Sequence, residues 1–238
     1  MVIFGIDLVL LIPALMISAT PVLLAAIGEA VVEKSGVLNL GVEGMMITGA
    51  VIGFIFAVNT QIPIYGFICA AIAGALLSVL FAVLTQYIMS NQVATGLGLT
   101  MVGLGLSALI GKPYEGIRSP TLSKIEIPIL SDIPILGPMI FSHDAVVYFS
   151  VILVASVAFV ISKTRVGLVL RAVGENQEAA HALGYKVVRI RFLAIMFGGA
   201  TAGIGGADII LARVPQGTAG RTAGAGWIAL ALVVFASW

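Results

Sequence analysis

Charged residues are scarce in this chain. Of its 238 residues, 10% are Asp, Glu, Lys or Arg and 60% are hydrophobic. Soluble domains carry about 25% charged residues, so an ordinary water-soluble domain is excluded. The net charge is only +1, and a chain this close to neutral offers no strongly basic surface to nucleic acid. The composition therefore predicts an integral membrane protein without a nucleic-acid partner.

Cysteine and histidine are nearly absent too. The single cysteine, Cys69, lies in an apolar run, so an internal disulfide is excluded and a packing or lipid-facing role is expected. The two histidines, His143 and His181, have no cysteine or carboxylate at the spacing of metal ligands. We expect neither a metal site nor a cofactor.

Motifs for catalysis are missing as well. The string closest to a nucleotide-binding Walker A loop ends in Gly111-Lys112-Pro113, and Pro113 stands where Ser or Thr would meet Mg²⁺. No dinucleotide fingerprint and no nucleophile elbow is found. The chain is predicted not to be an enzyme.

Long uncharged runs are what the chain has instead. About 20 apolar residues suffice for a helix to cross a bilayer. We predict an all-α, polytopic membrane bundle of about six full spans plus a partial last segment. Full spans are expected near residues 8–28, 41–58, 64–89, 93–111, 145–162 and 192–211. The last segment, 226–238, is too short to cross, and we expect the natural chain to continue past Trp238 rather than end in a half-helix.

The whole chain, 1–238, is interpreted as one transmembrane domain with two long connections. Residues 112–144 hold three Lys or Arg, four acids and five prolines, whereas residues 163–191 hold six Lys or Arg. Basic loops stay in the cytoplasm, so 163–191 is predicted cytoplasmic and 112–144 external. Counting back through the spans places 29–40 in the cytoplasm and the N-terminus outside. Within 112–144, a short strand or a surface segment is expected over 125–130.

The most charged stretch, 171–191, is predicted to contain a short surface helix. Acidic and amide side chains stand at the start of this helix, where they interact favourably with its unpaired N–H groups and with the positive end of its dipole. Alanines and Leu183 are good helix formers, and Gly184 stands where a left-handed cap would end the helix. A helix-sized polar loop in an apolar chain is expected to contact something in the water phase.

A glycine-rich polar stretch opens the second span. Asn39, Gly41, Glu43 and Gly44 interrupt an apolar context there. Broken helices with ionisable groups form polar sites in transporters, so these four residues are candidates for the substrate pathway. The alternative is that Asn39 caps the second helix and Glu43 lies in its first turn. Asp208, deep in the sixth span, is a fifth candidate; its alternative is an interfacial ion pair with Arg213 or Arg221.

Two stretches resemble one family of transport proteins. GEAVVEKSGVLNLGVEGMMITGA, from Gly28 to Ala50, is similar to the N-terminal signature of permease subunits of bacterial ABC importers. The similarity is to the nucleoside and simple-sugar branch of the ribose and branched-chain amino acid permease superfamily. ENQEAAHALGYKV, from Glu175 to Val187, resembles the cytoplasmic coupling loop of such importers, with its core at Glu178, Ala179, Ala180 and Gly184. The segment from Gly220 to Trp238 looks like a late segment of the same branch.

The resemblance implies the partners. It implies a prokaryotic, multi-pass cell-membrane protein that pairs with a second permease subunit and with two cytoplasmic ATPase subunits. An external lipoprotein would deliver the substrate to 112–144, and the helix around Glu178 to Gly184 would dock the ATPase. The substrate would be a nucleoside or a related sugar-containing solute.

Three alternatives stay open. The first is a permease of the same superfamily for sugars or branched-chain amino acids. The second is an ion-coupled secondary transporter, which would need paired ionisable groups inside the membrane, and the uncharged run 44–111 is poor in them. A membrane-embedded enzyme is the third, and it lacks paired acids, a metal set or an activated nucleophile.

Overall fold

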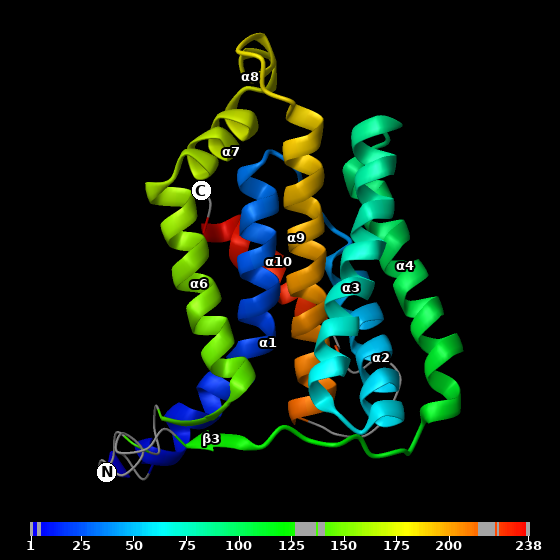
Figure 1. Cartoon of the computed structure of the whole chain (residues 1–238), viewed down its shortest axis with the longest axis vertical. Coiled ribbons are helices and arrows are strands. Elements are labelled where there is room, and N and C mark those ends of the chain that lie inside the picture. Colours follow the sequence, from blue (N-terminus) through cyan, green and yellow to red (C-terminus); the bar gives the residue numbers. More distant parts are fainter. Residues whose placement is uncertain are drawn as a thin grey trace.

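The fold is a bundle of long helices (Figure 1). This computed structural model describes residues 2–3, 6–126, 137, 141–213, 222 and 224–236. We call the two ends of the bundle the α8 end and the β3 end, after the elements that mark them in Figure 1. The N-terminus lies at the β3 end, and the long helices alternate in direction from there (Figure 1).

The first half of the chain supplies four helices. Before them, β1 (Val2–Ile3) pairs with β2 (Ile6–Asp7). The helices, with the π-helix and 3₁₀ turn that extend two of them, are α1 (Leu8–Lys34), α2 (Val42–Thr60), α3 (Pro63–Ala82) with η1 (Val83–Tyr87), and α4 (Gln92–Gly111) with η2 (Lys112–Tyr114).

The described part of the second half adds a small hairpin and five helices. Strand β3 (Lys124–Glu126) pairs antiparallel with β4 (Ser142–Asp144). The helices are α6 (Ala145–Lys163), α7 (Arg165–Glu175), α8 (Gln177–Ala182), α9 (Val187–Asp208) with the π-helix η3 (Ile209–Arg213), and the short apolar α10 (Ala225–Ala236).

The predicted membrane bundle is confirmed. In the described part of the chain, six helices are long and apolar enough to cross a bilayer, and α10 is a shorter apolar one. The first span was predicted to stop at residue 28, but α1 continues to Lys34 and includes Glu29. A carboxylate that finds buried hydrogen-bond partners does not end a helix. The sixth span was predicted from 192, but α9 begins at Val187.

Small residues place α9 at the centre of the bundle. Helix α9 packs against α1, α2 and α3 (Figure 1). A β-carbon added to Gly203 would overlap the Ala70 carbonyl oxygen of α3, and one added to Gly206 would overlap the Met46 carbonyl oxygen of α2. Such close backbone approach is how membrane helices associate without large side chains.

The two long connections differ from simple loops. Ile125 lies in strand β3, which confirms a strand at that position, while 127–130 fall outside the described residues. The connection predicted as the loop 163–191 is largely helical: α7 occupies Arg165–Glu175 and α8 occupies Gln177–Ala182. Helix α7 has a strongly one-sided apolar face, with Leu170 and Val173 buried, so it packs against the bundle.

Residues 35–41 do not stay at the α8 end. They run from the end of α1 into the bundle before α2 starts, as Figure 1 shows behind α9. A β-carbon on Gly44 would lie 2.8 Å from the Cα of Thr100, the ninth residue of α4. Because an α-helix rises about 1.5 Å per residue, Gly44 lies about 12 Å below the start of α4. The start of α2 therefore lies partway down the bundle, beside the middle of α4, rather than at its α8 end.

Candidate functional site

One stripe of α4 holds the descending segment 35–41. Gln92, Gly96 and Thr100 recur every four residues and so share one face of α4. The Gln92 side-chain oxygen accepts the Leu38 N–H at 2.9 Å, and the Thr100 hydroxyl donates to the Leu40 carbonyl at 3.2 Å. Between them, a β-carbon on Gly96 would lie 2.9 Å from the backbone nitrogen of Leu40. The segment is therefore bound to α4 by hydrogen bonds and close contact.

Asn39 faces α1 and binds a buried acid there. Its backbone N–H donates to Glu29 Oε1 at 3.2 Å, and its Nδ2 donates to Glu29 Oε2 at 3.4 Å. Asn39 is 0% exposed and Glu29 is 1% exposed. The Asn39 side-chain oxygen accepts the Gly41 N–H at 3.0 Å. A buried carboxylate needs such donors, so the pair fixes the path of the chain between α1 and α2.

Glu43 binds the start of α10. Its Oε1 accepts from the Thr222 hydroxyl at 2.7 Å and from the Gly224 N–H at 3.1 Å, and its Oε2 accepts from the Gly226 N–H at 2.7 Å. The side chain is 4% exposed. Unpaired N–H groups and the helix dipole favour a negative charge at this point. Glu43 thus caps a helix that follows about 180 residues later in the chain.

Gly41 and Gly44 allow α4 to approach. A β-carbon on Gly44 would lie 2.7 Å from the Leu99 carbonyl oxygen, and one on Gly41 would lie 3.3 Å from Leu99 Cδ2. On the facing helix, a β-carbon on Gly103 would lie 2.5 Å from the Gly44 carbonyl oxygen. The four candidates Asn39, Gly41, Glu43 and Gly44 therefore lie together, inside the bundle.

The capping alternative is half right. Glu43 lies in the first turn of α2, as that alternative expected. The N-cap of α2 is Gly41, however, and no side chain caps it. Asn39 as the cap is therefore wrong, because its side chain is taken up by Glu29 and the Gly41 N–H.

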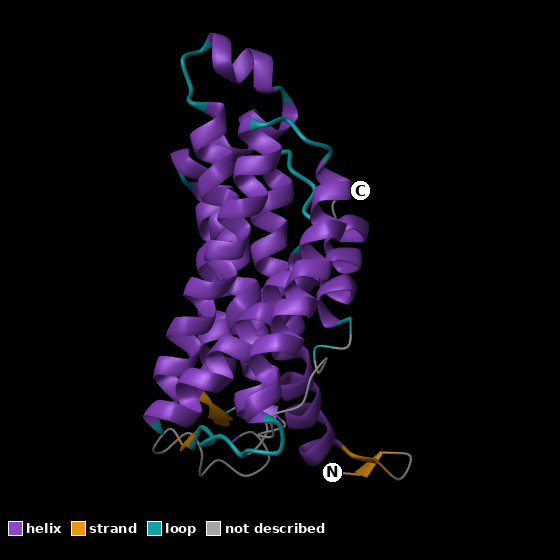
Figure 2. Cartoon of the chain, turned by 90° about the vertical axis from the view of Figure 1, so that its right-hand side faces the viewer, coloured by secondary structure: helices purple, strands orange, loops and turns teal. Residues whose placement is uncertain are grey.

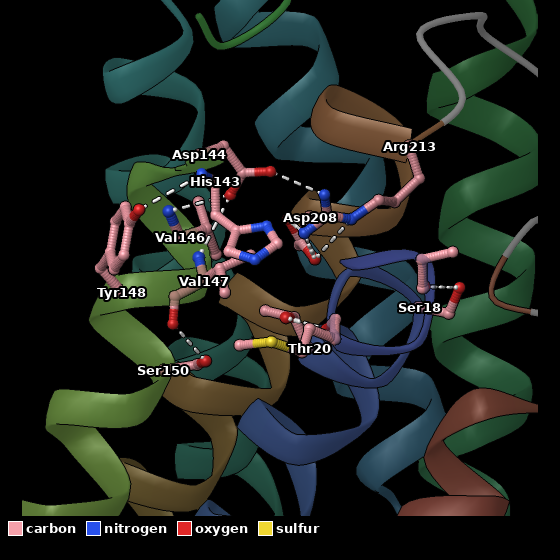
Figure 3. A network of polar contacts seen from close by, with 12 residues as sticks. Ser18, Thr20, His143, Asp144, Val146, Val147, Tyr148, Ser150, Asp208 and Arg213 are labelled. Carbon is pink, nitrogen blue, oxygen red and sulfur yellow. Dashed lines mark hydrogen bonds and ion pairs between the residues drawn. The ribbon is translucent and has the colours of Figure 1, made fainter. Parts of the chain in front are cut away.

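Asp208 belongs to a second cluster (Figure 3), at the end of α9 that lies toward β3 (Figure 1). It is the last residue of α9 and is 0% exposed. Arg213 Nη2 lies 3.0 Å from both carboxylate oxygens, and Arg213 Nε donates to Oδ2 at 3.2 Å. The predicted pair with Arg213 is confirmed, whereas Arg221 lies outside the described residues.

Asp144 completes this second cluster. Its Oδ2 lies 2.7 Å from Arg213 Nη1, and its Oδ1 accepts the backbone N–H groups of Val146 and Val147 at the start of α6. One guanidinium therefore joins α6 to the end of α9, with two carboxylates on one fork. Figure 3 shows His143 and Tyr148 beside it, with the Tyr148 hydroxyl accepting the His143 N–H at 3.2 Å.

Helix α8 projects beyond the other helices at its end of the bundle (Figures 1 and 2). Asn176 caps its start, because its side-chain oxygen accepts the Ala179 N–H at 2.9 Å. Gly184, at φ +87°, ends it: its N–H donates to the His181 carbonyl and the Tyr185 N–H donates to the Ala180 carbonyl. This pair of bonds is the Schellman motif. The predicted surface helix with a glycine cap is confirmed. Glu178 and Ala179 are exposed, while Ala180 is buried.

Three important residues were missed in the sequence. Glu29 looked like part of a polar loop, Asp144 like one of four acids in an external connection, and Arg191 like one of six basic residues in a cytoplasmic connection. The apolar residues that follow Glu29 were a usable signal, because they continue the helix past it. The contact of Asp144 with Arg213 spans 69 residues and that of Arg191 with Ser35 spans 156 residues, and no local pattern points to these two contacts.

A membrane bundle whose second helix begins inside the bundle, with an exposed polar helix at one end, fits one class of protein: a transport subunit of the membrane. The family model described as "Branched-chain amino acid transport system / permease component" matches residues 11–238. The chain therefore belongs to this permease family. It is a permease component of an ABC transport system and a multi-pass protein of the plasma membrane.

Relatives with curated names agree with this class. The chain is 39% identical over 225 residues to the putative glucose ABC transporter permease protein TsgC13 of Haloferax volcanii, covering 93% of this chain and 68% of that protein. It is 34% identical to the guanosine ABC transporter permease protein NupQ of Bacillus subtilis, covering 96% and 76%. It is 31% identical to the nucleoside ABC transporter permease protein NupC of Lactococcus lactis, covering 94% and 74%. No solved structure matches the chain.

Proposed function

We propose that this chain forms the import pathway for nucleosides or a related small sugar-containing solute, driven by ATP hydrolysis in a separate subunit. Two of the three relatives above are named for guanosine or nucleoside transport and one for glucose transport. The second candidate substrate is a branched-chain amino acid, which the name of the family suggests.

Helix α8 is the observation that supports docking of an ATPase. It is capped at both ends, exposed on most of its surface and held at the end of the bundle where the basic connection lies. A short rigid helix of this kind can be pushed as a unit, which suits rigid-body alternating access. Glu178, Ala179, Ala180 and Gly184 are its proposed docking residues.

The pathway is proposed to run past the broken start of α2. Asn39, Gly41, Glu43 and Gly44 lie inside the bundle, at a point where two helix N-termini meet. Because Glu43 already accepts three hydrogen bonds, we assign it the role of holding α10 at the pathway rather than that of a direct substrate ligand. Asp208 would hold the β3 end of the same domain closed through Arg213.

The remaining partners follow from the proposed orientation. Residues 1–238 would act as one transmembrane domain, with the α8 end in the cytoplasm and the connection 112–144 outside. That connection would receive the substrate from an external binding lipoprotein. A second permease subunit, identical or related, would complete the pathway across from this one.

The docking role is tested by Glu178→Arg combined with Gly184→Trp. We expect this variant to bind its ATPase about 30-fold more weakly, the equivalent of a 2 kcal/mol interface hot spot. Co-purification in detergent measures binding of the ATPase. A second assay measures how strongly the lipoprotein, loaded with guanosine, glucose or leucine, stimulates ATP hydrolysis. Glu175→Arg, an exposed charge reversal just before α8, is the control.

The same assay separates the candidate substrates. Stimulation by guanosine or glucose supports the proposed import function, whereas stimulation by leucine alone would replace it with amino-acid import. Unchanged assembly and stimulation in the α8 variant would disprove docking at α8.

A further inference from the structure

Arg191 joins three parts of the chain at the α8 end. It is the fifth residue of α9. Its Nε donates to the Ser35 carbonyl oxygen at 3.0 Å, and its Nη1 donates to Gln177 Oε1 at 2.8 Å. Ser35 follows the end of α1, and Gln177 is the first residue of α8. One guanidinium therefore connects the proposed docking helix to the turn that leads into segment 35–41.

The turn beside Arg191 is tightly built. Gly36 adopts φ +81°, a conformation that side chains disfavour. A β-carbon there would also lie 2.9 Å from Arg191 Nη2 and 3.0 Å from the Cα of Gly174 in α7. One on Gly174 would overlap the Lys34 carbonyl oxygen. The backbones of α1 and α7 are thus in close contact at this point, with the Arg191 guanidinium of α9 against the same turn.

The charge of Arg191 suits its position. The carbonyl groups at the end of α1 carry the negative end of the helix dipole, which favours a cation. The planar guanidinium can also donate to two acceptors in different directions, which an ammonium group does less well. By contrast, Arg189 is exposed and lies with Tyr87 and Phe192 at the edge of a shallow hollow.

From Ser35 the connection continues to the polar site. Asn39 lies four residues further and is bound to Glu29, and Glu43 lies eight residues further and is bound to the start of α10. Every step between α8 and α10 is thus a described hydrogen bond or a few residues of backbone. A continuous set of contacts therefore joins the proposed docking helix α8 to the proposed pathway at the start of α2.

We propose that Arg191 is a positioning residue that transmits movement of α8 to segment 35–41 and so couples ATP hydrolysis to opening of the pathway. This role rests on the proposed docking of the ATPase at α8. It predicts a variant that assembles and hydrolyses ATP but moves little substrate. A residue that only oriented the chain in the membrane would not change that ratio.

The experiment compares Arg191→Met with Arg189→Met in the complete transporter, reconstituted in liposomes with its ATPase and lipoprotein. We expect both variants to co-purify with the ATPase as the wild type does. Substrate taken up per ATP hydrolysed should fall about tenfold for Arg191→Met, within the range by which residues between two sites alter coupling. It should stay unchanged for Arg189→Met, and Arg191→Lys should recover part of it.

Gln177→Ala keeps the test decisive if Arg191→Met folds poorly. Gln177 is exposed, and its removal breaks only the α8 side of the bridge. We expect a lower uptake per ATP in Gln177→Ala, and no further loss when Arg191→Met is added, because both remove one connection.

The outcomes separate this role from docking itself. Normal uptake per ATP in Gln177→Ala and Arg191→Met would overturn the transmission role while leaving α8 as the docking site. Loss of ATPase binding in Arg191→Met, with Gln177→Ala fully coupled, would also overturn it and assign Arg191 to assembly. Docking at α8 fails separately, if Glu178→Arg with Gly184→Trp assembles normally.

Discussion

Glu43→Ala is expected to destabilise the protein by about 3 kcal/mol and to abolish uptake, because it leaves buried donors without an acceptor. The Thr222 hydroxyl and the N–H groups of Gly224 and Gly226 all bind this carboxylate. A loss of this size lowers the melting temperature of a chain this long by about 6–12 °C. Thermal unfolding in detergent measures the stability, and uptake in liposomes measures transport.

Two variants serve as controls for Glu43. Glu43→Gln keeps one oxygen for Thr222 and Gly224 but turns an amide donor toward the Gly226 N–H, so an intermediate loss is expected. Glu115→Ala removes an exposed acid near the β3 end and should change neither property. A stable Glu43→Ala protein with lost uptake would instead favour Glu43 as a direct substrate ligand.

Arg213→Met should cost about 3–5 kcal/mol, because it removes the cation from a buried ion cluster and leaves two carboxylates facing each other. Asp208 and Asp144 lie 3.0 and 2.7 Å from this guanidinium. The same melting assay measures the loss. Since α6 and α9 are joined here, we also expect faster proteolysis of the connection between β3 and α6.

A second substitution tests whether charge causes the loss. Arg213→Met with Asp208→Asn removes one of the two unpaired carboxylates and should recover part of the stability. Arg118→Met, at an exposed cation near the same end, should have no effect. If the double variant is no more stable than Arg213→Met, packing of the arginine stem rather than its charge holds this end.

The spans and the cap of α8 could be predicted from sequence because their causes are local. Uncharged runs predict membrane helices, and Asn176 and Gly184 stand beside the groups that they satisfy. The depth of segment 35–41 could not be predicted. It depends on Glu43 binding Gly226, 183 residues away, and on Thr100 binding Leu40, 60 residues away.

The same distinction explains the errors at helix ends. Glu29 looked like a reason to end the first span, because an unpaired carboxylate inside a membrane is costly. Its partner Asn39 makes it a buried member of α1 instead. Arg191 looked like a topology signal, and its two acceptors belong to a turn and a helix that only the folded chain brings together.

Docking of the ATPase on α8 is tested most directly by cross-linking. Cys69 is the only cysteine, so Cys69→Ser gives a cysteine-free background. In this background a single new cysteine, from Glu178→Cys or Ser123→Cys, is labelled with a photoactivatable cross-linker that reacts with thiols. Both positions are exposed, at the α8 end and near β3 respectively. We predict an adduct with the ATPase from position 178 and none from position 123. An adduct from position 123, or none from position 178 in the assembled transporter, would contradict the proposed docking and orientation.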